Sequence, residues 1–249
     1  TGFGEEYPQN CWELNGHGYL GIRQGIVVSC DVVFYEIARD FYNARQSIGN
    51  DAMQDFIKEF GYAKVTGIDL SGEAEGRIPT PEWKANYFRD VPAEAQWLPG
   101  DMSNMSIGQG YVLVTPIQVV RAYAAVATGR LLKPHLLREV RNSQGDIAIT
   151  AQTVEDSRPD VDEANYKIMR DALNGVTLES ADVAEDFGGL DFTAAAKTGT
   201  AEVAGKKDFA WFACYAPFED PKYSLALIIE EGGSGGSVAS PIAAKIMDV

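Results

Sequence analysis

The stretch Lys197-Thr198-Gly199-Thr200 has the residue types that bind a carboxylate. Lys197 supplies positive charge, the hydroxyls of Thr198 and Thr200 supply directional donors, and Gly199 leaves room for a ligand's backbone. Two β-type segments follow, which places this stretch on the first strand of an antiparallel set. A solvated edge strand protected by its lysine is the alternative, and these four residues alone do not separate the two.

A second candidate, Ser29-Cys30-Asp31, lies where one helical pattern ends and another begins. Ser and Asp are favoured at helix N-termini because their side-chain oxygens accept backbone N–H groups. On local grounds alone, we therefore expect Ser29 and Asp31 to cap the second helix.

The three cysteines, Cys11, Cys30 and Cys214, are an odd set at irregular spacing, which is not the pattern of a disulfide framework. One pair and a free thiol remain compatible with it. Cys11 and His17 could supply half of a metal site, but no second closely spaced pair completes it. The sequence therefore does not predict a metal centre.

Composition bounds the class of protein. The 249 residues are 45% hydrophobic and carry a formal net charge of -15, as in an acidic globular protein. Nucleic acid or an anionic membrane surface would repel such a charge, so neither is expected as the main partner. We find no secretory signal and no apolar run of membrane-spanning length. The chain also starts on a Gly- and Asn-rich loop, as a fragment of a longer protein would.

Periodicity and turn residues predict helices before an antiparallel sheet, which is an α+β fold. The helical part covers about residues 1–175 and the sheet part about residues 186–249. The expected helices are two consecutive ones from about residue 22 to residue 38, then residues 52–60, 81–88, 115–127, 162–173 and 241–249. Sheet strands are expected at residues 193–202, 209–216 and 223–230, and a peripheral hairpin at residues 136–141 and 146–150. The irregular stretch at residues 62–110 is long enough to suggest a functional loop.

Together these features resemble the transpeptidase domain of a penicillin-binding protein, within the penicilloyl-serine transferase group. The group's motifs are Ser-x-x-Lys, Ser-x-Asn and Lys-Thr-Gly. Ser29-Cys30-Asp31 matches the second with Asp in place of Asn, and Lys197-Thr198-Gly199 matches the third. Other segments resemble the elongation-type class B enzymes: residues 16–18, 29–38, 60–62, 66–70, 79–84, 107–111 and 115–118.

The first motif is missing, because no Ser-x-x-Lys occurs in the 249 residues. In the family this motif lies on a helix several tens of residues before Ser-x-Asn, and Ser29 is too near the start for that helix to fit. The resemblance therefore implies the C-terminal portion of a transpeptidase domain without its nucleophile, inactive by itself.

The resemblance also implies roles for the remaining motifs. The family's serine attacks the D-Ala-D-Ala end of a peptidoglycan stem peptide and forms an acyl-enzyme, which β-lactams mimic. Ser29 would relay a proton to the leaving group, and Asp31 would bind the substrate backbone or the missing lysine. Lys197 would supply positive potential. Thr198 and Thr200 would bind the terminal carboxylate beside Gly199, and the Thr200 N–H would form half of the oxyanion hole.

Implied partners are peptidoglycan stem peptides, β-lactam antibiotics and an elongation glycosyltransferase. The implied location is the outer face of the cytoplasmic membrane, through an upstream anchor, and no cofactor is implied. Two alternatives keep the fold but not the activity: a β-lactam or peptidoglycan sensor, and a scaffold that binds partners through residues 62–110. A serine β-lactamase is disfavoured because no deacylating glutamate is evident. A Ser-x-x-Lys in upstream sequence would favour the enzyme, and a substituted motif the scaffold.

Overall fold

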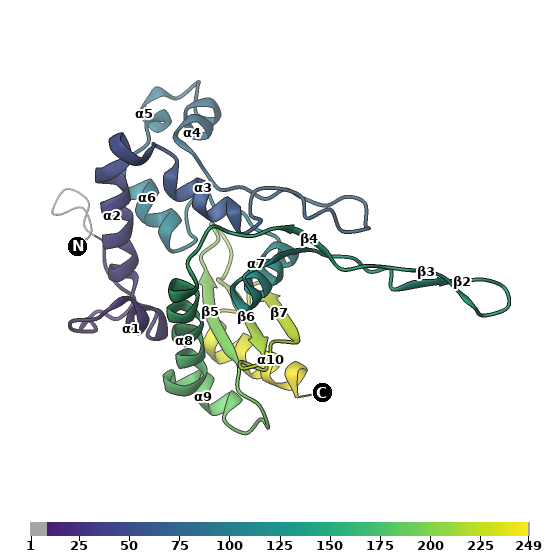
Figure 1. The fold of residues 1–249 in the computed structure, drawn as a ribbon. Coiled ribbons are helices and arrows are strands. Elements are labelled where there is room, and N and C mark those ends of the chain that lie inside the picture. Colours follow the sequence, from purple (N-terminus) through teal and green to yellow (C-terminus); the bar gives the residue numbers. More distant parts are fainter. Residues whose placement is uncertain (1–8, 249) are drawn as a thin grey trace.

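The computed structural model describes residues 9–248, so the expectations for residues 1–8 and for Val249 lie outside the described residues. Figure 1 shows a body of helices around a small sheet, from which a long β-arm projects. The helices are α1 (Ile22–Val27), α2 (Asp31–Ile48), α3 (Ala52–Glu59), α4 (Pro81–Tyr87), α5 (Pro92–Ala95), α6 (Pro99–Ser106), α7 (Pro116–Thr128), α8 (Glu163–Glu179), α9 (Ala181–Phe187), the π-helical turn η1 (Gly235–Ala239) and α10 (Ser240–Met247). The strands are β1 (Leu131–Lys133), β2 (Glu139–Arg141), β3 (Ile147–Thr150), β4 (Val154–Ser157), β5 (Ala195–Ala201), β6 (Phe209–Ala216) and β7 (Tyr223–Ile229).

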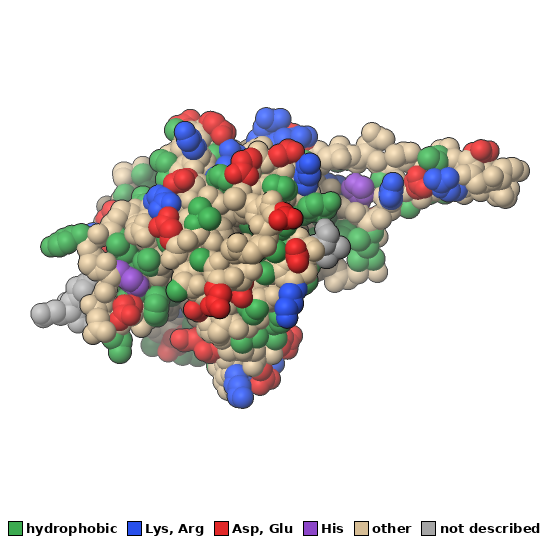
Figure 2. Space-filling view, turned by 90° about the horizontal axis from the view of Figure 1, so that it is seen from below, with side chains coloured by type: hydrophobic (Ala, Val, Ile, Leu, Met, Phe, Trp, Pro, Cys, Tyr) green, Lys and Arg blue, Asp and Glu red, His purple; other side chains and the backbone are tan. Residues whose placement is uncertain are grey.

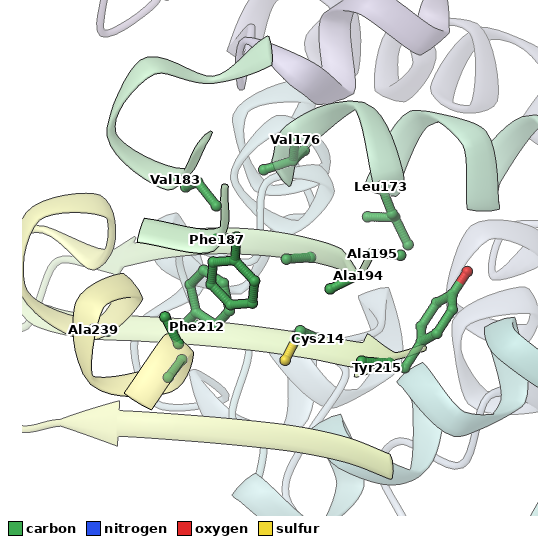
Figure 3. Packing of buried hydrophobic residues seen from close by; sticks show 14 of the residues in the cluster. Leu173, Val176, Val183, Phe187, Ala194, Ala195, Phe212, Cys214, Tyr215 and Ala239 are labelled. Carbon is green, nitrogen blue, oxygen red and sulfur yellow. The ribbon is translucent and has the colours of Figure 1, made fainter. Parts of the chain in front are cut away.

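The central sheet is antiparallel with the order β5-β6-β7, as the sequence predicts. Helix α8 packs against β5, α7 packs against β6 and β7, and α10 contacts β6. The middle strand β6 is almost entirely buried, which explains its nearly uninterrupted apolar sequence. Figure 3 shows Phe212 and Cys214 of β6 packed beneath Val176 of α8 and Phe187 of α9.

Helix α7 connects this sheet to the irregular stretch. Its N-terminus is a capping box, in which the Thr115 hydroxyl accepts the Gln118 N–H and the Gln118 side chain accepts the Thr115 N–H. The fully buried Gln118 amide also donates to the carbonyl oxygens of Lys64 and Glu75, at 2.8 and 2.7 Å. One side chain of a central helix therefore ties two points of the long stretch at residues 62–110 to the body.

The arm consists of two short ribbons in line, β1 with β4 and β2 with β3. The β2–β3 hairpin was predicted, whereas β1 and β4 were not. They are only three and four residues long, and the buried Arg121 of α7 stabilises their pairing by donating to the Leu132 carbonyl and to the Asp156 carboxylate. Such a tertiary contact leaves no periodic signal in the strand sequences.

The predicted helices were too short or missing at three places. Helix α2 continues ten residues beyond 38, to Ile48, where it packs against α6. Helix α8 continues six residues beyond 173, because Val176 is buried against the sheet and the Thr177 hydroxyl donates to the Ala194 carbonyl. Helix α9 lies in a segment where no helix was expected, and its Phe187 is buried in the core. The observed mixture of helices and antiparallel strands confirms the α+β class, while the division near residues 175–186 stays a prediction.

The surface agrees with the composition. Figure 2 shows a face on which acidic and basic side chains are interspersed over the body rather than gathered into a basic surface. Within residues 9–248, no helix combines the length and the apolar character needed to cross a membrane.

Candidate active site

Ser29 occupies the turn that ends α1. The Cys30 N–H donates to the Gly25 carbonyl at 2.8 Å and the Ser29 N–H to the Ile26 carbonyl at 3.3 Å, which is the Schellman pattern of a helix C-terminus. In this pattern the residue at the Ser29 position is left-handed, and Ser29 has φ +53°. Glycine normally takes this position, because a left-handed L-residue costs about 1–2 kcal/mol. A serine kept here at that cost marks a candidate functional residue.

The capping role expected for Ser29 and Asp31 is wrong. Cys30 is the N-cap residue of α2, and no side-chain capping hydrogen bond forms there. The Asp31 carboxylate instead accepts the backbone N–H of Trp12 at 3.1 Å. The left-handed turn directs the Ser29 side chain away from the N-terminus of α2. Neither Ser29 nor Asp31 therefore caps this helix.

Lys197 lies on β5, opposite Ala213 of β6, and is half-buried. Burial lowers the pKa of its ammonium from 10.5 to about 8, and the negative charge of Asp31 acts in the opposite direction. Lys197 therefore remains mostly protonated at neutral pH but can lose its proton more readily than a surface lysine.

The Lys197 ammonium donates a hydrogen bond to the Ser29 hydroxyl. It also lies 3.2 Å from the Thr198 carbonyl. A lysine with a lowered pKa in contact with a hydroxyl forms a pair along which a proton can move. The structure therefore brings together Ser29 and Lys197, two candidates that the sequence places 168 residues apart.

Helix α8 makes this contact possible, because it packs against both α1 and β5. Arg23 of α1 forms ion pairs with Asp171 and Glu179 of α8, at 2.7 and 2.6 Å. Gly175 lets the two helices approach closely, since a Cβ at this position would lie only 2.8 Å from a methyl group of Val27. The end of α1, and with it Ser29, is thereby placed beside the first strand of the sheet.

Thr198, Gly199 and Thr200 follow Lys197 along the second half of β5. Thr198 is half-buried and Thr200 is exposed, and the Thr200 hydroxyl accepts the Gly235 N–H at 3.4 Å. A Cβ at Gly199 would lie 3.1 Å from the Cβ of Trp211, so a side chain here would press against the neighbouring strand. The Gln109 amide reaches the Thr200 carbonyl at 3.5 Å, which brings the end of the irregular stretch to this edge.

A small hollow lies beside Lys197, between α7 and the sheet. Val119 and Tyr123 line it from α7, and Lys197, Gly199 and Trp211 line it from β5 and β6. The hollow is mostly apolar apart from the lysine. A side chain entering it would come close to Lys197.

Cys11, His17 and Cys30 form a cluster next to Ser29. Their ligand atoms lie within 4.8 Å of one another, and the Cys11 Sγ is 3.6 Å from the His17 Nδ1. Burial raises the pKa of the Cys30 thiol, whereas metal binding requires the thiolate. Two sulfurs and one imidazole are ligands that suit zinc, with one coordination position left over.

Sequence reasoning missed three residues of this region. Cys30 completes the half site of Cys11 and His17, but its distance along the chain hid it from a search for closely spaced pairs. Trp12 and Gln109 contact the motif residues from loops, and nothing in their local sequence indicates where those loops pack. Fold-level contacts alone reveal them.

The comparisons with known proteins identify the family. Residues 4–248 match the penicillin-binding protein transpeptidase domain. Peptidoglycan D,D-transpeptidase MrdA of Salmonella typhimurium LT2 is 31% identical over 254 residues, which cover 95% of this chain and 39% of that protein. The MrdA protein of Haemophilus influenzae is 32% identical over 259 residues, which cover 95% and 37% respectively.

Solved structures agree. Penicillin-binding protein PBP2 of Helicobacter pylori aligns with a TM-score of 0.79 and 26% identity, over 98% of this chain and 42% of its own. PBP2 of Pseudomonas aeruginosa, in complex with WCK 5153, aligns with a TM-score of 0.80 and 28% identity, over 98% and 52%. The fold is thus the transpeptidase fold of penicillin-binding proteins, and the chain belongs to this family. It spans about two fifths of the length of the curated relatives it matches.

Proposed function

We propose that this chain carries the proton-transfer and carboxylate-binding half of a peptidoglycan D,D-transpeptidase active site. The single observation that carries the proposal is the hydrogen bond from the Lys197 ammonium to the Ser29 hydroxyl. Ser29 passes its hydroxyl proton to the leaving D-Ala amine, the Lys197 ammonium replaces this proton on Ser29, and the proton lost by the attacking nucleophile restores the ammonium. Lys197 also supplies positive potential. Asp31 raises the pKa of Lys197 against the effect of burial, which favours its charged form.

Substrate binding is assigned to the edge of β5. The Thr198 and Thr200 hydroxyls bind the terminal carboxylate of the stem peptide, with Gly199 between them. The Thr200 backbone N–H supplies one of two oxyanion donors. The exposure of Thr200 at this edge supports the assignment.

Acyl transfer needs a nucleophile, and no Ser-x-x-Lys is present in the 249 residues. We assign the hollow beside Lys197 to the helix that would carry this motif, because a serine there would face the Lys197 ammonium. The 249 residues by themselves therefore form no acyl-enzyme. β-Lactams, stem peptides and an elongation glycosyltransferase are the proposed partners of the complete enzyme, on the outer face of the cytoplasmic membrane.

Intact-mass spectrometry after incubation with a penicillin tests the proposal. The chain is compared with a version extended upstream to include Ser-x-x-Lys, and Ser29→Ala in the extended version is the control for the proton relay. We expect one penicilloyl adduct on the extended protein, slower acylation of the Ser29→Ala variant, and no adduct on the chain alone. If the extended protein is folded and gains no mass, acyl transfer is wrong for this protein.

A further inference from the structure

Trp12 contacts both ends of the Ser29-Cys30-Asp31 segment. Its indole Nε1–H donates to the Ser29 carbonyl at 2.8 Å, and its backbone N–H donates to the Asp31 carboxylate at 3.1 Å. Trp12 lies on the loop before α1, so these bonds join a separate part of the chain to the candidate motif.

The Ser29 carbonyl has particular need of this partner. The Schellman bonds of the turn use the N–H groups of Ser29 and Cys30 and leave the Ser29 carbonyl aside. The left-handed conformation of Ser29 is strained and persists only where surrounding contacts favour it. A hydrogen bond to the Ser29 carbonyl fixes the following peptide plane, and with it the backbone from which the Ser29 side chain projects.

The exposure of Trp12 argues against a simple packing role. The residue is 63% exposed, so its burial contributes little of the free energy that a core tryptophan provides. One edge contact orients the ring: the His17 imidazole lies 5.3 Å from it at an interplanar angle of 62°. The indole is therefore better explained by its hydrogen bond, which fixes the strained Ser29 backbone, than by burial of its ring.

We propose that Trp12 is a positioning residue, whose indole N–H holds the Ser29 backbone in the arrangement in which the Ser29 hydroxyl meets the Lys197 ammonium. Trp12 does not itself act on the substrate. The catalytic consequence of this inference rests on the proposed function. The contacts among Trp12, Ser29 and Lys197 are present in these 249 residues without any further segment.

A double-mutant cycle in this chain tests the inference without any acylation. Trp12→Phe keeps an aromatic ring and removes the N–H donor, Ser29→Ala removes the hydroxyl, and Tyr19→Phe is the control, because Tyr19 is a fully exposed aromatic of the same loop. The readout is the pKa of Lys197, followed by NMR of lysine labelled with carbon-13 and nitrogen-15. Thermal denaturation verifies that each variant is folded.

We expect Trp12→Phe to shift the Lys197 pKa in the same direction as Ser29→Ala does. In the double variant the pKa should equal that of Ser29→Ala, because Trp12 acts through Ser29. Tyr19→Phe should leave it unchanged. The inference is overturned if Trp12→Phe titrates like the unaltered chain, or if the two shifts add in the double variant.

The rate of acylation of the upstream-extended version tests whether Trp12 contributes to the proposed reaction. Trp12→Phe should slow penicilloylation by about tenfold through misplacement of the relay, with no further loss in the Ser29→Ala background. An unchanged rate would overturn the positioning role. If the unaltered extended protein is not acylated at all, the proposed function fails, while the NMR cycle still decides whether Trp12 positions Ser29.

Discussion

The ammonium of Lys197 on β5 donates a hydrogen bond to the hydroxyl of Ser29 at the end of α1. The two groups belong to different layers of the molecule and meet because α8 holds α1 against the sheet. Their contact combines a strained backbone with a buried charge, and each of these features has a measurable consequence.

Relief of the backbone strain should stabilise the protein. Glycine adopts the φ of +53° at Ser29 without a steric cost, and both Ser29→Gly and Ser29→Ala lose the hydrogen bond with Lys197, so Ser29→Gly should exceed Ser29→Ala in free energy of unfolding by about 1 kcal/mol. Ser29→Ala retains the strain and should bring no such gain. Urea denaturation of both variants checks this, and a Ser29→Gly protein no more stable than Ser29→Ala would contradict it. Both variants lose the relay hydroxyl, so the stabilised variant should still be slow in acylation.

The buried Lys197 should make stability depend on pH in the alkaline range. Burial lowers its pKa to about 8 in the folded chain, from 10.5, so the unfolded chain binds more protons between these two values. The free energy of unfolding should therefore rise from about pH 8 to about pH 10.5, because loss of the proton removes the cost of burying the Lys197 ammonium. Below about pH 8 that cost applies in full. Lys197→Met removes this contribution. Urea denaturation across this range should show a smaller rise in the variant, and identical pH profiles would refute the assignment.

The ion pair of Lys84 and Asp101 should be essential for the stability of the irregular stretch at residues 62–110. The Lys84 Nζ lies 2.6 and 2.8 Å from the two Asp101 oxygens, and the side chains are only 5% and 12% exposed. Lys84→Met would leave a buried carboxylate without its partner, which should cost about 3–5 kcal/mol of stability. Lys58→Met is the matched control, because the exposed Lys58–Asp55 pair should contribute about 0.5 kcal/mol or less. Equal losses in chemical denaturation would contradict the prediction.

The Cys11, His17 and Cys30 cluster should bind one zinc or cobalt ion. Cobalt should give a thiolate charge-transfer band, and saturation at about 100 times the Kd should stabilise the fold by about 2.7 kcal/mol. Binding should strengthen as pH rises, because the pKa of the Cys30 thiol is raised and the thiol must lose its proton. Cys30→Ala should abolish the band, whereas Cys214→Ala, which changes a buried cysteine of β6, should not. A band that survives in Cys30→Ala would exclude this site, and a chelator should reverse the stabilisation.

Much of the fold could be predicted because its signals are local. The helix that begins after Thr115 and ends before Gly129 has a capping box at one end and a left-handed glycine at the other. The strands at residues 209–216 and 223–230 are marked by their apolar runs. The predictions were wrong where long-range contacts replace local preference, as at the end of α8, which the Thr177 contact with Ala194 supports.

The sequence by itself determined which chemical groups are present: the hydroxyl of Ser29, the ammonium of Lys197, and no Ser-x-x-Lys. Residue types and their order were enough for the family, because they do not depend on packing. Only the tertiary structure decided that Ser29 takes a left-handed turn and meets Lys197 instead of capping α2. The physical reason is that this contact depends on the packing of α8 against α1 and β5 and on the hydrogen bond from Trp12 to the Ser29 carbonyl. These partners are distant in the sequence, so residues close to Ser29 do not reveal them.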